Sequence, residues 1–72
     1  MAIHIGIVEQ IGKTAGTVWQ LLDDVGPMPL SAIIKKVDAP RDLVMQSIGW
    51  LAREDKLTLS EQGRRKTVHL RS

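Results

Sequence analysis

The chain has 72 residues, of which 43% are hydrophobic, enough for one small domain around a single core. It contains no cysteine, which excludes disulfides and thiolate-bound metal, and its apolar runs are too short to span a bilayer. The formal net charge is +2, but residues 1–52 carry four basic and five acidic side chains, whereas residues 53–72 carry six and three. We therefore expect one cytoplasmic domain over residues 1–72, with its positive charge near the C-terminal end.

The first predicted element is an amphipathic helix over residues 8–25. Its apolar residues recur at intervals of three and four, as one face of a helix requires: Val8, Ile11, Ala15, Val18, Leu22 and Val25. Gly26-Pro27 is predicted to end this helix. Before it, isoleucines at alternate positions have the period of a strand, which indicates an extended segment over residues 2–6.

Two further helices are predicted after this first one. Met28-Pro29-Leu30 is too short for an independent strand, and we expect it to pair along the edge of a small sheet. A short helix is predicted over residues 31–37, with Ser31 as its N-cap. For the helix that follows, Asp38 is the predicted cap and Pro40 suits the first turn.

Projected at 100° per residue, this third helix has two distinct faces. The inner face is predicted to hold Val44, Ser47, Ile48, Leu51 and Asp55. The outer face is predicted to hold Asp42, Met45, Gln46, Gly49, Arg53 and Lys56. The outer face is the surface that the helix offers to a partner.

A hairpin completes the predicted fold. Its strands are expected over residues 57–60 and 67–71, joined by a basic tip over residues 61–66. The alternating pattern predicts that four side chains face the helices: Leu57, Leu59, Val68 and Leu70. The sequence thus predicts a mainly α fold with a small antiparallel β-hairpin.

No residue pattern in the chain indicates catalysis. There is no nucleophile motif and no isolated pair of acids in an apolar stretch. His4 and His69 are the only histidines, and no carboxylates stand at a recognisable ligand spacing from them. We expect a protein that is not an enzyme and that holds neither a metal nor a cofactor.

The basic tip carries the strongest functional signal. Arg64, Arg65 and Lys66 are adjacent, and three cations on a hairpin tip can reach the phosphates of a nucleic acid. A charged tip can equally serve as a solvated turn that prevents edge aggregation. In the third helix Gln46 can read adenine, whereas Asp42 repels phosphate, so a partner other than DNA stays open.

The aromatic residues and the helical glycines suggest a second kind of surface. Trp19 and Trp50 are the only aromatic residues, so stacking on exposed bases has little support. They can pack at the edge of the core, or form a protein interface if they are exposed. Gly12 and Gly16 share one helix face, which favours close packing of a neighbouring element.

The order helix, turn, helix and hairpin resembles a winged helix-turn-helix domain. Two motifs, Ala15-Gly16-x-x-Trp19 and Gly49-Trp50-Leu51-Ala52-Arg53-Glu54, are similar to a small prokaryotic winged-helix family of uncharacterised function. The wider superfamily places the third helix in the DNA major groove and the wing on the backbone. The resemblance therefore implies a set of DNA-binding residues: Arg41, Met45, Gln46, Arg53, Arg64, Arg65 and Lys66.

Two functional hypotheses remain from the sequence. The first is a DNA-binding module on double-stranded DNA, acting as a small transcription regulator. The second is a protein-interaction module or homodimer that uses Trp19 and Trp50 without contacting DNA.

Overall fold

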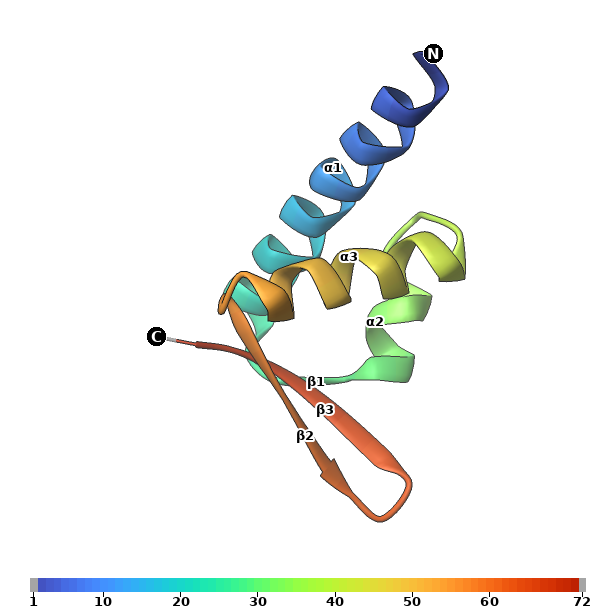
Figure 1. Cartoon of the computed structure of the whole chain (residues 1–72). Helices are drawn as coiled ribbons and strands as arrows, with labels where there is room; N and C mark the ends of the chain where they lie inside the picture. Colours follow the sequence, from blue (N-terminus) through green and yellow to red (C-terminus); the bar gives the residue numbers. More distant parts are fainter. Residues whose placement is uncertain (1, 72) are drawn as a thin grey trace.

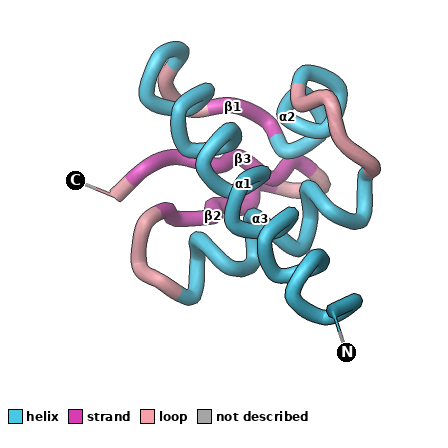
Figure 2. The backbone as a smooth tube through the Cα atoms, turned by 90° about the horizontal axis from the view of Figure 1, so that it is seen from above, coloured by secondary structure: helices cyan, strands magenta, loops and turns pink. Residues whose placement is uncertain are grey.

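The computed structural model describes residues 2–71, which form three helices and three short strands (Figure 1). The elements in chain order are α1 (Ala2–Val25), β1 (Met28–Pro29), α2 (Leu30–Lys36), α3 (Arg41–Arg53), β2 (Leu57–Gln62) and β3 (Arg65–Leu70). The strands form one antiparallel sheet in the order β1-β3-β2. Viewed from above, α1 and α3 lie over the strands and α2 flanks them (Figure 2). This confirms the predicted fold class.

Helix α1 begins earlier than predicted and extends beyond the rest of the fold (Figure 1). The expectation of an extended segment over residues 2–6 was wrong, because these residues continue α1 toward its N-terminus. Once the following turns exist, each added residue gains a hydrogen bond without a new nucleation cost. The helix ends at Val25, before Gly26, whose φ of 93° is unfavourable for other residues.

Only the middle of the predicted apolar stripe of α1 is buried. Ala15, Val18 and Leu22 lie in the core, whereas Val8 is 68% exposed and Val25 is also exposed. The periodicity was correct, but α1 is longer than the body against which it packs. The two ends of the stripe therefore have no covering element among the described residues.

All three helices and the sheet contribute to one core. Its buried hydrophobic residues are Ala15, Val18, Leu22, Met28, Ile33, Val37, Val44, Ile48, Leu51, Leu57 and Val68. The predicted inner face of α3 is confirmed at Val44, Ser47, Ile48 and Leu51. Ser47 is fully buried, and its hydroxyl lies 2.8 Å from the carbonyl oxygen of Leu43 and 3.2 Å from that of Ile11. The hydroxyl can thus donate across the α1–α3 contact.

The starts of α2 and α3 differ from the predicted caps. Proline occupies the N-cap position of both helices, Pro29 in α2 and Pro40 in α3, and neither has a side-chain capping hydrogen bond. The predictions of Ser31 and Asp38 as caps were therefore wrong. Pro29 already has an extended conformation because it pairs with β3, so α2 begins directly after it.

The end of α3 shows why Asp55 is not on its inner face. Asp55 adopts a φ of 61°, and its N–H donates to the carbonyl of Ala52 while that of Lys56 donates to Leu51. This is the hydrogen-bond pattern of a Schellman motif, which turns the chain away from the helix axis. Asp55 is consequently exposed, and its carboxylate lies 3.2 Å from the guanidinium of Arg71.

The hairpin is longer and its tip shorter than the sequence indicated. Met28 pairs with Val68 in the sheet, which confirms the predicted edge pairing of this segment. Leu57 and Val68 are buried as predicted, but Leu59 is 48% exposed. The expectation for Leu59 was wrong because it lies on β2, an edge strand of the sheet. Its cross-strand neighbour Val68 in the central strand β3 is fully buried, whereas Leu59 stands at the open side of the sheet.

Candidate nucleic-acid interface

The basic wing tip is built by a two-residue turn. Gln62 pairs with Arg65, which leaves Gly63 and Arg64 as the loop. Gly63 has a φ of 60°, and a positive φ at the first loop residue alone is the feature of a type II′ turn. Two of the three predicted cations, Arg65 and Lys66, therefore lie in β3, whose regular pairing fixes their backbone.

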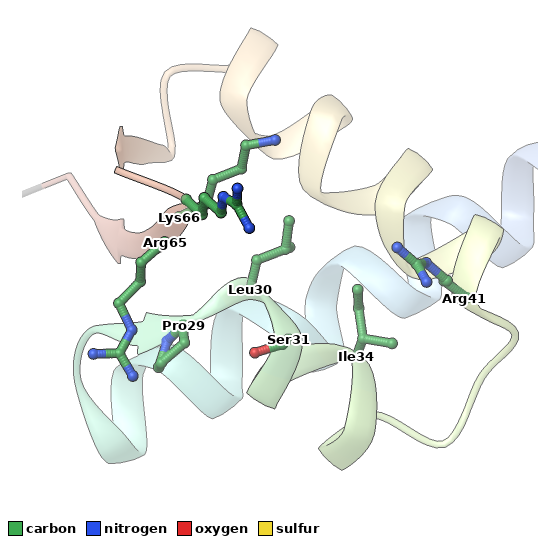
Figure 3. Close-up of a pocket in the computed structure, with 8 residues that line it drawn as sticks. Pro29, Leu30, Ser31, Ile34, Arg41, Arg65 and Lys66 are labelled. Carbon is green, nitrogen blue, oxygen red and sulfur yellow. The ribbon is translucent and has the colours of Figure 1, made fainter. Parts of the chain in front are cut away.

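The wing cations share a hollow with the start of α3, which we call the basic hollow (Figure 3). It has a volume of about 390 Å³ and is lined by Pro29, Leu30, Ser31, Ile34, Arg41, Arg64, Arg65 and Lys66. Leu30 and Ile34 of α2 form its apolar floor between Arg41 and the wing (Figure 3). Four cationic side chains from two distant segments thus surround one cavity.

No acidic residue lines the basic hollow. Within residues 2–71, the structure has one ion pair, between Arg71 and Asp55. Among the same residues, no carboxylate forms an ion pair with any of the four cations of the hollow. Glu61 is the cross-strand neighbour of Lys66, yet the two form no ion pair. Because the four cations are exposed and unpaired, the hollow can attract an anion and bind it through charge-assisted hydrogen bonds.

The other predicted contacts on α3 are placed differently. Met45, Gln46 and Arg53 are all exposed, but none of them lines the basic hollow. Arg53, at the opposite end of α3, lies about 18 Å from Arg41 along the axis, at 1.5 Å per residue. The structure thus brings Arg41 to the wing and leaves Gln46 and Arg53 on the outer face of the helix.

Met45 borders a second cavity, which we call the apolar hollow. Its volume is about 310 Å³, and it is lined by Leu30, Met45, Ile48, Gly49, Leu59, Ser60, Glu61 and Lys66. The sequence did not indicate this cavity, because Leu59 was expected in the core and Leu30 in a short strand. The sequence did carry one signal for it, because Met45 is a large apolar residue on the predicted outer face of the third helix.

The two tryptophans line a third cavity, which lies between α1 and α3. This groove, the tryptophan groove, has a volume of about 330 Å³ and is lined by Gly12, Ala15, Gly16, Trp19, Trp50, Leu51 and Lys56. Trp19 is 38% exposed and Trp50 is 48% exposed. A Cβ atom added at Gly12 or Gly16 would meet nothing within 4 Å, so the expected close packing against these glycines was wrong.

The arrangement of helices and hairpin agrees with a known family. The model of the winged helix-turn-helix domain family DUF2582 matches residues 7–70. The chain belongs to this winged helix-turn-helix family. An uncharacterized protein of Methanocaldococcus jannaschii is 35% identical over 65 residues, which cover 86% of this chain and 91% of that protein. No solved structure matches the chain.

Membership in the winged helix-turn-helix family assigns the parts of the structure. Helices α2 and α3 form the helix-turn-helix, and the β2–β3 hairpin is the wing. The basic hollow therefore lies where the wing approaches the start of α3. None of the described helices has the length and apolarity of a membrane span, and the described side chains hold no cluster of three metal-ligating residues.

Proposed function

We propose that this winged helix-turn-helix domain binds double-stranded DNA and acts as a small, non-enzymatic transcription regulator. The observation that supports the proposal is that Arg41, Arg64, Arg65 and Lys66 line one cavity between the start of α3 and the wing. Cations on a turn, a strand and a helix start have backbone positions that the fold sets, so they can contact phosphates at fixed relative positions. Phosphate contacts of this kind position a protein on a duplex.

The outer face of α3 supplies the base-reading part of the proposal. Gln46 is exposed on that face and can donate to and accept from an adenine edge in the major groove. Arg53, near the far end of the helix, can reach the phosphate backbone. Asp42 opposes this contact, because its carboxylate is exposed near the start of α3 and keeps its negative charge while it accepts a hydrogen bond from the N–H of Leu43 at 3.0 Å.

The experiment is a titration of a fluorescent duplex of mixed sequence with the protein, followed by anisotropy at several salt concentrations. If all four cations of the basic hollow contact phosphates, log K should fall against log salt with a slope of up to about −3.6, at 0.9 per phosphate. A flat salt dependence, or no binding at low salt by the folded domain, contradicts the proposal. Light scattering on the same samples gives the mass of the complex.

A protein-interaction or homodimerisation role is the second candidate, and the tryptophan groove favours it. Trp19 and Trp50 are both partly exposed and lie in one cavity, and aromatic residues are enriched in interface cores. Trp50 and Arg41 are nine residues apart on α3, which places them on opposite sides of a helix with 3.6 residues per turn. A partner in the groove therefore leaves the basic hollow open.

A further inference from the structure

We propose that the basic hollow and the apolar hollow form one amphipathic trough, which binds a small organic anion with an apolar body. Leu30 and Lys66 line both hollows, so the two cavities meet at these residues. The volumes of about 390 and 310 Å³ are typical of sites for small molecules, which range from about 300 to 1,000 Å³. We call the combined cavity the trough.

The two ends of the trough have different chemistry. Arg41 and Arg64 lie at one end, where an anionic headgroup can accept hydrogen bonds from two guanidinium groups. Met45, Leu59 and Gly49 lie at the other end, which suits a hydrocarbon chain or ring. Glu61 also lines the apolar end, and its carboxylate repels a second anionic group. The charge pattern therefore selects a ligand with a single charged headgroup and an uncharged far end.

Two large apolar side chains at the apolar end of the trough are left partly exposed to solvent. Met45 is 41% exposed and Leu59 is 48% exposed, and both line the same cavity. A DNA backbone can satisfy the cations at the basic end, but its phosphates offer nothing to these two side chains. An amphipathic anion matches both ends, because its chain covers the apolar side chains while its headgroup binds the arginines.

The position of the trough gives the ligand a regulatory effect, and this part rests on the proposed function. A ligand bound against Arg41 and Arg64 occupies cations that the duplex needs, so ligand and DNA exclude each other. The ligand would then act as an effector that releases the domain from DNA. Binding of the ligand itself does not depend on that step.

Direct binding is tested by NMR, with octanoate as the probe and the methyl groups of Met45, Leu59, Leu30 and Ile48 as reporters. Octanoate should cause saturable shifts of these methyl groups. Acetate, which has the headgroup alone, and octanol, which has the chain alone, should bind at least tenfold more weakly. An absence of saturable shifts, equal binding of acetate or octanol, or shifts confined to the tryptophan groove overturns the proposal.

Two variants locate the site. A Cβ atom at Gly49 meets nothing within 4 Å, so Gly49→Leu starts a side chain at the apolar end from an open position and introduces a better helix former. This variant should fold and weaken octanoate binding at least tenfold. Arg64→Ala should weaken binding similarly by removing a headgroup contact. Lys13→Ala, an exposed helical cation outside all three cavities, is the matched control and should bind octanoate normally.

Competition is measured separately by adding octanoate to the complex of the protein and the fluorescent duplex. Octanoate should lower the anisotropy with the native protein, and the same concentration of acetate, which lacks the chain, should have little effect. If the methyl shifts saturate while the duplex stays bound, the regulatory part is wrong and the ligand site stands. If the domain binds octanoate but no duplex at all, the proposed function fails independently of the trough.

Discussion

Arg41, the first residue of α3, and Arg64, in the wing turn, line the same cavity although the whole of α3 and β2 separates them in the sequence. The fold places them on one cavity because α2 contacts both α3, which begins with Arg41, and β3, which follows Arg64. Leu30 and Ile34 form the apolar floor of the cavity between them, and the cations at its sides stay exposed to solvent. The cavity is thus a joint product of the helix-turn-helix and the wing.

Removal of the wing cations should weaken DNA binding without loss of sequence preference. Arg64→Ala, Arg65→Ala and Lys66→Ala combined should reduce the magnitude of the salt slope by up to about 2.7, at 0.9 per phosphate contact. The measurement is duplex anisotropy at several salt concentrations, with Lys13→Ala as the single-charge control. An unchanged slope in the triple variant would remove the wing from the proposed interface.

The core predicts a strong contrast between two isoleucines. Ile33 is fully buried, so Ile33→Ala should cost about 2 to 5 kcal/mol of the free energy of unfolding, a large share for a domain of this size. Ile7 is exposed on α1, so Ile7→Ala should change it by less than about 0.5 kcal/mol. Urea denaturation followed by circular dichroism compares the two. Equal effects would contradict the placement of the core.

At the end of α3, we expect the backbone conformation of Asp55 to contribute more to the free energy of unfolding than its ion pair with Arg71. Asp55→Ala should destabilise by about 1 kcal/mol, because alanine tolerates a φ of 61° poorly, whereas Asp55→Gly should not. Arg71→Ala removes the ion pair alone, which is well exposed on both sides, and should cost less than about 0.5 kcal/mol. Thermal unfolding of the three variants separates the contributions, and a loss from Arg71→Ala as large as from Asp55→Ala would reverse this order.

The tryptophan groove predicts that Trp50 is not essential for folding. Because about half of its side chain is exposed, Trp50→Ala should cost less than the 3 to 5 kcal/mol typical of a buried tryptophan and should leave unfolding cooperative. If the groove is a homodimer interface, the same variant should shift the mass measured by light scattering toward the monomer. Loss of the folded state on this substitution would instead make Trp50 a core residue.

The order and type of the helices and strands could be predicted because their signals are local. The apolar period of α1 and α3 and the stop at Gly26-Pro27 depend on nearby residues only, and all are confirmed. Errors arose where the exposure of an apolar side chain depends on which other elements lie beside it in the fold. Val8 and Leu59 have the correct periodicity, yet Val8 lies on the part of α1 that extends past the core and Leu59 lies on an edge strand.

The candidate site could be predicted in part. The wing cations stood out in the sequence as three adjacent basic residues, whereas Arg41 came only from the resemblance to winged helix-turn-helix domains. The sequence could not show that Leu30 and Ile34 lie between them, since this depends on how α2 packs beneath the hairpin. The end of α3 was also hidden, because a Schellman motif is usually marked by glycine and here has Asp55.

The most direct test of the proposed DNA interface is a map of the duplex on the protein by NMR, with amide and arginine side-chain signals assigned. The proposal predicts that a mixed-sequence duplex shifts Arg41, Arg64, Arg65 and the amides of the wing turn, with smaller changes at Gln46. Shifts that instead gather at the indole signals of Trp19 and Trp50, with the basic hollow unchanged, would contradict it.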